Sequence, residues 1–132
     1  MSERVHLEVP ATVASLSPIR MVVGGVGARF DLSLDDLEDL YLAVGELLRV
    51  AEELGAAATY GMMIDVASDR LIVTVGPFRS PALLARLRVE PTTELCLDLC
   101  QLLDGVLDSF TVRQGEADFS VEMIKRRQTK ET

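Results

Sequence analysis

Polar and apolar residues alternate at the start of the chain, and the spacing then becomes helical. Residues 4–9 place valine or leucine at every second position, and Pro10 ends the run. A period of two predicts a half-buried strand. Residues 12–30 carry apolar side chains at helical spacing, but Gly24, Gly25 and Gly27 fall inside this stretch. Each glycine costs a helix about 1 kcal/mol relative to alanine, so we expect a loosened helix end or a turn there.

The clearest helical pattern covers residues 33–54. Ser33 is a good N-cap, four acidic side chains crowd the first turns, and Gly55 is a typical residue just after a helix. The apolar residues that recur at spacings of three and four are Leu34, Leu37, Tyr41, Val44, Leu48 and Ala51. This spacing predicts a long helix with one face against a core.

The second half of the chain predicts two hairpins separated by helical segments. Residues 59–66 and 70–75 are rich in β-branched side chains and are joined by a short polar turn. Residues 76–81 contain Gly76, Pro77 and Pro81 and predict a break, followed by a short amphipathic segment at 83–87 and a helix at about 95–107. Residues 109–113 and 119–125 predict the second hairpin. The resulting order, β-α-α-β-β-α-β-β, predicts an α+β fold, a two-layer α/β sandwich with an antiparallel-rich sheet.

Composition narrows the class of protein. The 132 residues, 48% of them hydrophobic, predict one globular domain over residues 1–127 with a short tail at 128–132. A formal net charge of −8 disfavours general binding to nucleic acid or to an anionic membrane, and no apolar run reaches the roughly 18 residues of a membrane span. Two cysteines form no disulfide framework, and the N-terminus lacks the layout of a signal peptide, so we expect a cytoplasmic protein.

Several stretches together resemble a known family. They are residues 16–20 (LSPIR), 32–46 (LSLDDLEDLYLAVGE), 102–106 (LLDGV) and 119–125 (FSVEMIK). In this order they resemble the anti-sigma-factor serine kinases of bacteria, in the GHKL (histidine-kinase-like) ATPase superfamily, over about residues 4–127. The resemblance implies the histidine-kinase-like ATPase (Bergerat) fold, a homodimer, and a sigma factor or a STAS-type anti-sigma-factor antagonist as partner. It places Arg20 at the partner contact, because the family grips its sigma factor with the first helix region. The first strand, polar on one side and apolar on the other, offers a surface for pairing or packing across a two-fold axis.

The residues that would bind ATP depart from the family pattern. The N-box of the family needs a glutamate and, four residues later, an asparagine that ligates Mg²⁺. Glu46 matches the first position, but Val50 stands at the second. The family's adenine-binding Asp and its following glycine correspond to Thr74 and Gly76, and the phosphate-binding Gly-x-Gly corresponds to residues 93–95, which read Thr-Glu-Leu. We therefore interpret Glu46, Thr74 and Gly76 as remnants of a degenerate nucleotide site that has no metal ligands and no cofactor.

Other chemistry-bearing residues have ordinary structural explanations. Glu46 is either a catalytic base or a solvated helix carboxylate near Arg49. Cys96 and Cys100 share a helix face but lack further metal ligands, so small buried side chains are the simpler interpretation. His6 lies on the polar side of the first strand. The basic run at 125–127, with Lys130, is typical of a solvated terminus.

Three functional hypotheses remain open. The first is an anti-sigma-factor-like regulatory binding protein that has lost ATP binding and kinase activity and acts by protein–protein contact in a bacterial partner switch. The second is an ATP-dependent serine/threonine protein kinase, with ATP and Mg²⁺ as cofactors, that phosphorylates a STAS-type antagonist. The third is a sensor that binds a small molecule in the emptied cleft.

Overall fold

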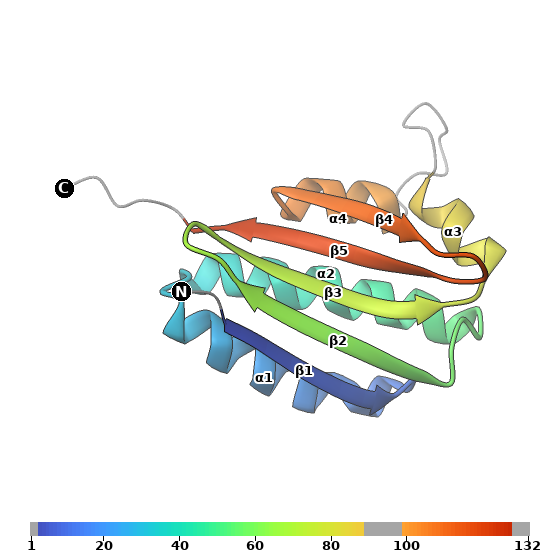
Figure 1. The fold of residues 1–132 in the computed structure, drawn as a ribbon, viewed down its shortest axis with the longest axis horizontal. Helices are drawn as coiled ribbons and strands as arrows, with labels where there is room; N and C mark the ends of the chain where they lie inside the picture. Colours follow the sequence, from blue (N-terminus) through green and yellow to red (C-terminus); the bar gives the residue numbers. More distant parts are fainter. Residues whose placement is uncertain (1–2, 89–98, 128–132) are drawn as a thin grey trace.

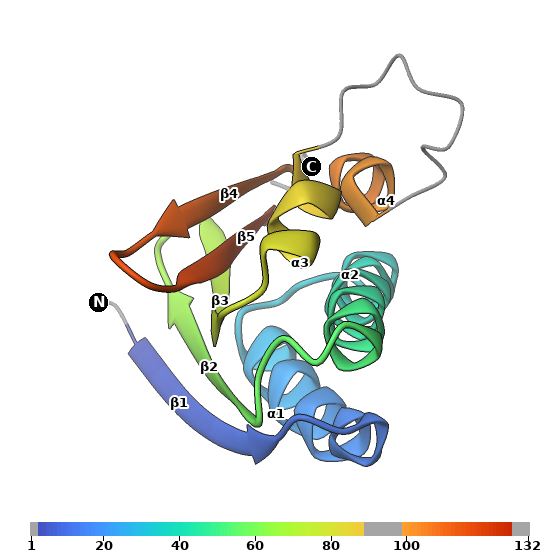
Figure 2. The same cartoon turned by 90° about the vertical axis from the view of Figure 1, so that its right-hand side faces the viewer.

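The chain folds into two layers. A computed structural model describes residues 3–88 and 99–127. Five antiparallel strands form one sheet in the order β1-β2-β3-β5-β4 (Figure 1). The helices of the described residues all lie on one face of this sheet, and the other face is uncovered by them (Figure 2). The predicted two-layer α+β sandwich is confirmed.

The elements follow the predicted order. The strands are β1 (Glu3–Pro10), β2 (Thr59–Val66), β3 (Arg70–Phe78), β4 (Ser109–Gln114) and β5 (Phe119–Arg126). The helices are α1 (Leu16–Arg29), preceded by the 3-10 turn η1 (Val13–Ser15), then α2 (Leu34–Glu53), α3 (Pro81–Leu87) and α4 (Leu99–Val106). Both predicted hairpins form. β3 runs on to Phe78 instead of ending at Val75, because Phe78 pairs with Phe119 of β5 and is fully buried.

The glycine run of α1 is regular helix, so the expected loosened end or turn is wrong. A Cβ on Gly24 would overlap the Tyr41 hydroxyl, and a Cβ on Gly27 would overlap the Leu37 side chain. Side chains of α2 thus occupy the space that methyl groups on α1 would need, and the two helices pack closely. This contact offsets the low helix propensity of glycine. A Cβ on Gly25, by contrast, would extend into open space.

Helix α2 begins and ends as the sequence predicts. The Ser33 hydroxyl accepts a hydrogen bond from the Asp36 N–H at 3.1 Å, and Gly55 follows the helix with a φ of +61°. The predicted apolar face is wrong at Leu34, which is 71% exposed. At 3.6 residues per turn, Leu34 lies about 120° round the helix from the buried Leu40. The apolar residues buried on α2 are Leu40, Ala43, Val44, Leu47, Leu48, Val50 and Ala51.

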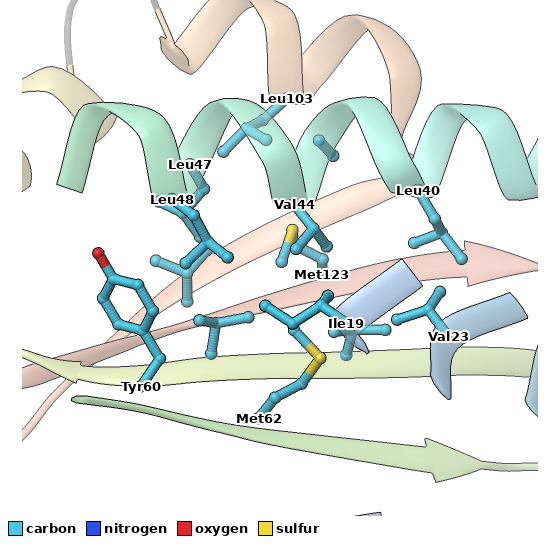
Figure 3. Close-up of a cluster of buried hydrophobic side chains, with 14 of the residues drawn as sticks. Ile19, Val23, Leu40, Val44, Leu47, Leu48, Tyr60, Met62, Leu103 and Met123 are labelled. Atoms are coloured by element: carbon cyan, nitrogen blue, oxygen red, sulfur yellow. The ribbon is translucent and has the colours of Figure 1, made fainter. Parts of the chain in front are cut away.

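The core fills the space between α2 and the sheet. Figure 3 shows Leu40, Val44 and Leu47 of α2 pointing toward the strands. Around them lie Ile19 and Val23 of α1, Met62 of β2, Leu103 of α4 and Met123 of β5. Tyr60, Phe78 and Phe119 form an aromatic group. The ring centroids of Tyr60 and Phe78 lie 5.5 Å apart, and those of Phe78 and Phe119 lie 5.6 Å apart. Phe30 is a further buried aromatic residue, and the rest of the core consists of aliphatic and methionine side chains.

Lys125 belongs to the interior and is no part of a solvated terminus. Its side chain is 11% exposed, and its ammonium lies 3.1 Å from Asp39 Oδ2 and 3.6 Å from Asp36 Oδ1. It also donates a 2.8 Å hydrogen bond to the Val106 carbonyl. Burial, the largest single influence, favours the neutral amine, but the hydrogen bond to Asp39 and the charges of Asp39, Asp36 and Asp108 together raise the pKa of Lys125. The predicted basic run is wrong here because alternation along β5 turns Lys125 toward the helices.

Some predictions fall outside the described residues. These are the phosphate-motif stretch at 93–95, Cys96, the first part of the predicted helix at 95–107, and the tail beyond residue 127. Within the described ranges, no helix combines the length and apolar character needed to cross a membrane.

Alanine at Gly25 and at Gly27 should change stability in opposite directions. Gly25→Ala adds a methyl group in open space and should raise the free energy of unfolding by about 0.5–1 kcal/mol through helix propensity. Gly27→Ala meets Leu37 and should lower it by about 1–3 kcal/mol through overpacking. Chemical denaturation of both variants beside the parent chain measures the two effects. Equal stabilisation by the two substitutions would mean that close packing of α1 on α2 does not need glycine.

Removing the Lys125 ammonium should destabilise the fold in a pH-dependent way. Lys125→Met should lower the free energy of unfolding by about 3 kcal/mol at neutral pH, because it leaves the 9%-exposed Asp36 without its cation. The folded chain holds the lysine proton more tightly than the unfolded chain. The stabilisation that the Lys125 charge gives is therefore complete below the ordinary pKa of 10.5. It is lost as the pH rises through the raised pKa of Lys125 in the folded chain.

Urea unfolding across this pH range tests the ion pair. The stability gap between the parent chain and Lys125→Met should shrink above about pH 10.5. The control is the triple variant Asp36→Asn, Asp39→Asn, Lys125→Met, in which the uncompensated carboxylates are gone and part of the lost stability should return. If the difference in the free energy of unfolding between the parent chain and Lys125→Met stayed constant with pH, the charge of Lys125 would not stabilise the fold.

Candidate functional site

Glu46, at the first N-box position, is held in an ion pair on the surface of α2. Arg49 donates hydrogen bonds to both carboxylate oxygens of Glu46, the shortest being 2.8 Å from Nη2 to Oε2, and it also contacts Glu53 at 2.7 Å. The hydrogen bond from Arg49 lowers the pKa of Glu46 below its usual value, assisted by the charge of Arg49 and opposed by partial burial. The carboxylate is therefore ionised at neutral pH and engaged by a neighbour on its own helix.

Val50, at the second N-box position, is part of the hydrophobic core. It is 3% exposed and packs in the main cluster of buried side chains. A hydrocarbon side chain offers no ligand to a cation. Across the part of the chain that the structure describes, no group of three or more His, Cys, Asp or Glu side chains is arranged to hold a metal ion.

Thr74 and Gly76 do not lie near Glu46. Val73 and Val75 are fully buried beneath the helices, so alternation along β3 turns Thr74 to the uncovered face. There it stands beside Met63 of β2 and Glu122 of β5. Helix α2, which carries Glu46, lies on the covered face of the sheet (Figure 2). Thr74 and Glu46 are therefore on opposite sides of the sheet.

Gly76 meets a steric demand of the sheet. A Cβ at Gly76 would come 2.6 Å from Ser120 Oγ, so a side chain there would push β5 away. Gly61 faces Gly76 across the β2–β3 ladder, and together they form the floor of a hollow of about 290 Å³. The walls of this hollow include His6, Glu8, Thr74 and Ser120.

Mg²⁺-ATP is the cofactor that the family resemblance implies, and the described residues do not fit it. The position for the metal-binding amide is apolar and buried at Val50. Glu46 is engaged by Arg49, and Thr74 lies on the other side of the sheet. The third motif, at residues 93–95, lies outside the described residues. The described remnants therefore form no common nucleotide-binding surface.

Arg20 lies on a different surface, over α2. Its guanidinium carbon sits 5.6 Å from the centroid of the Tyr41 ring, within the range of a cation–π contact. Arg20, Glu38, Asp39, Tyr41 and Leu42 line a shallow hollow of about 460 Å³, which we call the α1–α2 surface. Within the described residues Arg20 makes no ion pair, although Glu38 and Asp39 share the hollow.

The α1–α2 surface combines charge with exposed apolar side chains. Leu42 is 46% exposed, and Met21, next to Arg20 on α1, is 76% exposed. Within the described ranges, the large hydrophobic side chains that lie exposed are Met21, Leu34 and Leu42, and all three belong to α1 or α2. The surface presents an arginine guanidinium over a tyrosine ring, and both residue types are enriched at protein–protein interfaces.

The sequence predicts Arg20 as a partner contact but does not predict the residues around it. The apolar spacing predicts Tyr41 as a core position and gives Glu38 and Leu42 no part in a binding surface. The glycine run of α1 was the sequence feature that could have indicated the close approach of Tyr41, because Gly24 leaves the space that the Tyr41 hydroxyl occupies. A small residue on one helix thus lets an aromatic ring of the next helix reach across to Arg20.

His6 and Cys100 lie away from the α1–α2 surface. His6 is exposed on the uncovered face of β1, as predicted, and its Nε2 borders the hollow above Gly61. Cys100 is half-buried on α4. Neither belongs to the α1–α2 surface.

Comparison with known proteins gives a likeness of fold. Neither a protein-family model nor a curated protein sequence matches the chain. Thirteen chains of solved structures match it. One is the crystal structure of the RsbU and RsbW domains of Rv1364c from Mycobacterium tuberculosis, with a TM-score of 0.68 and 16% sequence identity. The match covers 94% of this chain and 32% of that one, so the present chain spans about a third of its length.

Proposed function

We propose that this chain is an anti-sigma-factor-like regulatory protein that acts by protein–protein contact in a bacterial partner switch, without ATP chemistry. The RsbW-like fold and the residues that resemble anti-sigma-factor serine kinases support the regulatory role. Its partner is a sigma factor or a STAS-type antagonist of one, which implies a cytoplasmic location.

The observation that carries the proposal is the burial of Val50. In the family pattern this position holds the metal-binding asparagine, whereas here it is a residue of α2 that is buried in the hydrophobic core. The helix that should organise Mg²⁺ and ATP therefore contributes packing instead. The ion pair of Glu46 with Arg49 leaves the remaining N-box residue with a structural role.

The alternative is an ATP-dependent serine/threonine kinase that phosphorylates a STAS-type antagonist. Glu46, retained at the catalytic position of a matching fold, is the observation in its favour. A phosphate-transfer assay with a purified STAS protein distinguishes the two functions. Transfer that Glu46→Gln abolishes would establish the kinase.

ATP should bind weakly or not at all. With the described metal and adenine positions lost, we expect a dissociation constant weaker than roughly 100 μM, which corresponds to about −5.5 kcal/mol. Isothermal titration with Mg²⁺-ATP measures it, and Glu46→Gln, which removes the remnant carboxylate, should behave like the parent chain. A low-micromolar constant with Mg²⁺ present would overturn the loss of ATP binding.

Partner binding should depend on Arg20. If its guanidinium meets a partner carboxylate, Arg20→Ala should weaken binding by about 2 kcal/mol, or roughly thirtyfold, with melting unchanged. Arg86→Ala, which removes the same charge from an exposed position of α3, is the matched control and should bind normally. Titration of purified sigma factors and STAS proteins, with and without ATP, measures both variants. Equal binding by Arg20→Ala would remove Arg20 from the contact, and capture that requires nucleotide would contradict the ATP-independent mechanism.

We further propose that the working form is a homodimer. The family resemblance implies it, and the uncovered face of the sheet provides surface for it. Light scattering at tens of micromolar tests this proposal, and a single species of 14.4 kDa would contradict it.

A further inference from the structure

The two outer strands of the sheet differ in how far they block pairing with another chain. In the order β1-β2-β3-β5-β4, β1 and β4 each have one neighbour among the described strands (Figure 1). β1 ends at Pro10 and carries the charged Arg4 and Glu8, and both features protect an edge. β4 contains no proline and pairs with β5 without a register shift, and its one charged residue, Arg113, is held by Glu122. Its outer edge can therefore accept another strand.

The β4–β5 hairpin determines which backbone groups lie on this edge. At its tip the Gly115 N–H donates a hydrogen bond to the Asp118 carbonyl at 2.7 Å. Because bonded and non-bonded pairs alternate along an antiparallel ladder, Thr111 directs its N–H and C=O groups to β5, whereas Phe110 and Val112 direct theirs outward. The backbone hydrogen bonds between described residues leave these outward groups unused. Phe110 and Val112 thus each present a donor and an acceptor to a chain that lies along β4.

Half-buried apolar side chains follow the same edge on the helical side. Phe110 and Val112 pair with the buried Met123 and Val121 of β5, so their side chains turn toward the helices. Val106 ends α4 shortly before β4 begins, and Leu84 of α3 lies close to the last residue of β4. We call Leu84, Val106, Phe110 and Val112, which all pack on the core and stay partly exposed, the β4 strip. An added strand with apolar side chains at every second position would cover it.

A hollow of about 310 Å³ adjoins the Leu84 end of the β4 strip. It lies between the start of α3 and the β4–β5 turn, and its lining includes Phe78, Leu84 and Gln114. Arg88, just after α3, donates a 3.1 Å hydrogen bond to the side-chain oxygen of Gln114 and so joins α3 to the end of β4. An apolar side chain at this end of an added strand can dock in the hollow.

Charge differs between the two ends of β4. At the hollow, Arg79 stands with Glu116 and Asp118, so both signs are present. At the other end Asp104, near the end of α4, and Asp108, just before β4, are exposed. The chain as a whole carries a formal charge of −8. A basic segment is therefore attracted, with its cations beside Asp104 and Asp108, whereas a second copy of this chain is repelled.

We infer that the outer edge of β4 binds an extended, basic segment of a partner protein, which adds to the sheet as a sixth strand antiparallel to β4. Antiparallel pairing is the arrangement of the whole sheet and is slightly more stable than parallel pairing. It places the C-terminal end of the segment beside Asp104 and Asp108. The six residues of β4 offer an edge of about 20 Å, which suits a weak, reversible contact. This site goes beyond the function proposed for Arg20.

Fluorescence polarisation with a labelled synthetic peptide tests the edge. The peptide alternates threonine with valine and ends in two lysines at its C-terminus, and it should bind the parent chain with a micromolar dissociation constant. Val112→Pro removes an outward N–H and leaves the hydrogen bonds to β5 in place, so it should weaken binding at least tenfold. The matched control, Val112→Ile, keeps the amide and the apolar side chain and should bind like the parent chain.

Changes to the peptide supply two further controls. A peptide N-methylated at the amides that face β4 keeps every side chain but loses these donors, and it should not bind. A peptide with the lysines moved to its N-terminus has the same composition but places its cations at the hollow, so it should bind more weakly. In nuclear magnetic resonance, binding should slow amide hydrogen exchange at Phe110 and Val112 and change it little at Thr111, which is already bonded to β5.

A charge reversal carries the test if circular dichroism shows that Val112→Pro does not fold. Asp104→Lys, at an exposed position, should weaken binding of the lysine-ended peptide and strengthen binding of a glutamate-ended one. No binding up to about 1 mM, or equal binding by Val112→Pro and the parent chain, would overturn the proposal. Self-association that Val112→Pro abolishes would assign the edge to a second copy and overturn it as well. None of these results bears on Arg20, because α1 lies far from β4 (Figure 2).

Discussion

The position of α2 over the sheet depends on one buried cation. Lys125 reaches from β5 into the helical layer, where it meets Asp36, Asp39 and the carbonyl of Val106, the last residue of α4. Asp39 also lines the α1–α2 surface, so the residue that anchors the helix borders the surface proposed for binding. Because α2 in turn receives α1 through two glycine contacts, the orientation of Arg20 also depends on the ion pair that joins α2 to β5.

Periodicity was a good guide to the elements and a poor guide to their outer faces. The strands, the two hairpins and the limits of α2 follow from alternation, caps and turn residues, which are local signals, whereas the pairing of β1 with β2 and of β3 with β5 does not. The faces of α2 do not, because Leu34 is as apolar as Leu40 and only the tertiary arrangement exposes one and buries the other. Composition misled in the same way at Lys125, where a basic run near the chain end concealed a buried residue, and at the glycines of α1, whose purpose is visible only beside Tyr41 and Leu37.

The candidate site shows a similar division. Counting along the family motif identified Glu46 and Val50 on one helix, and the structure keeps them on that helix. Counting along β3 assigned Thr74 to the same site, but strand alternation turns it to the opposite side of the sheet. A motif transferred by spacing alone does not specify on which face of a strand a side chain lies.

The burial of Val50 limits which side chains this position of α2 can hold. An asparagine there would place an amide among hydrocarbon side chains, and an unsatisfied buried polar group costs about 1–3 kcal/mol of a total stability that is commonly 5–15 kcal/mol. Val50→Asn alone would therefore weaken the fold. The neighbouring core side chains would also have to change to accommodate a polar group. The packing of one helical position thus constrains which ligands α2 can offer to a cation.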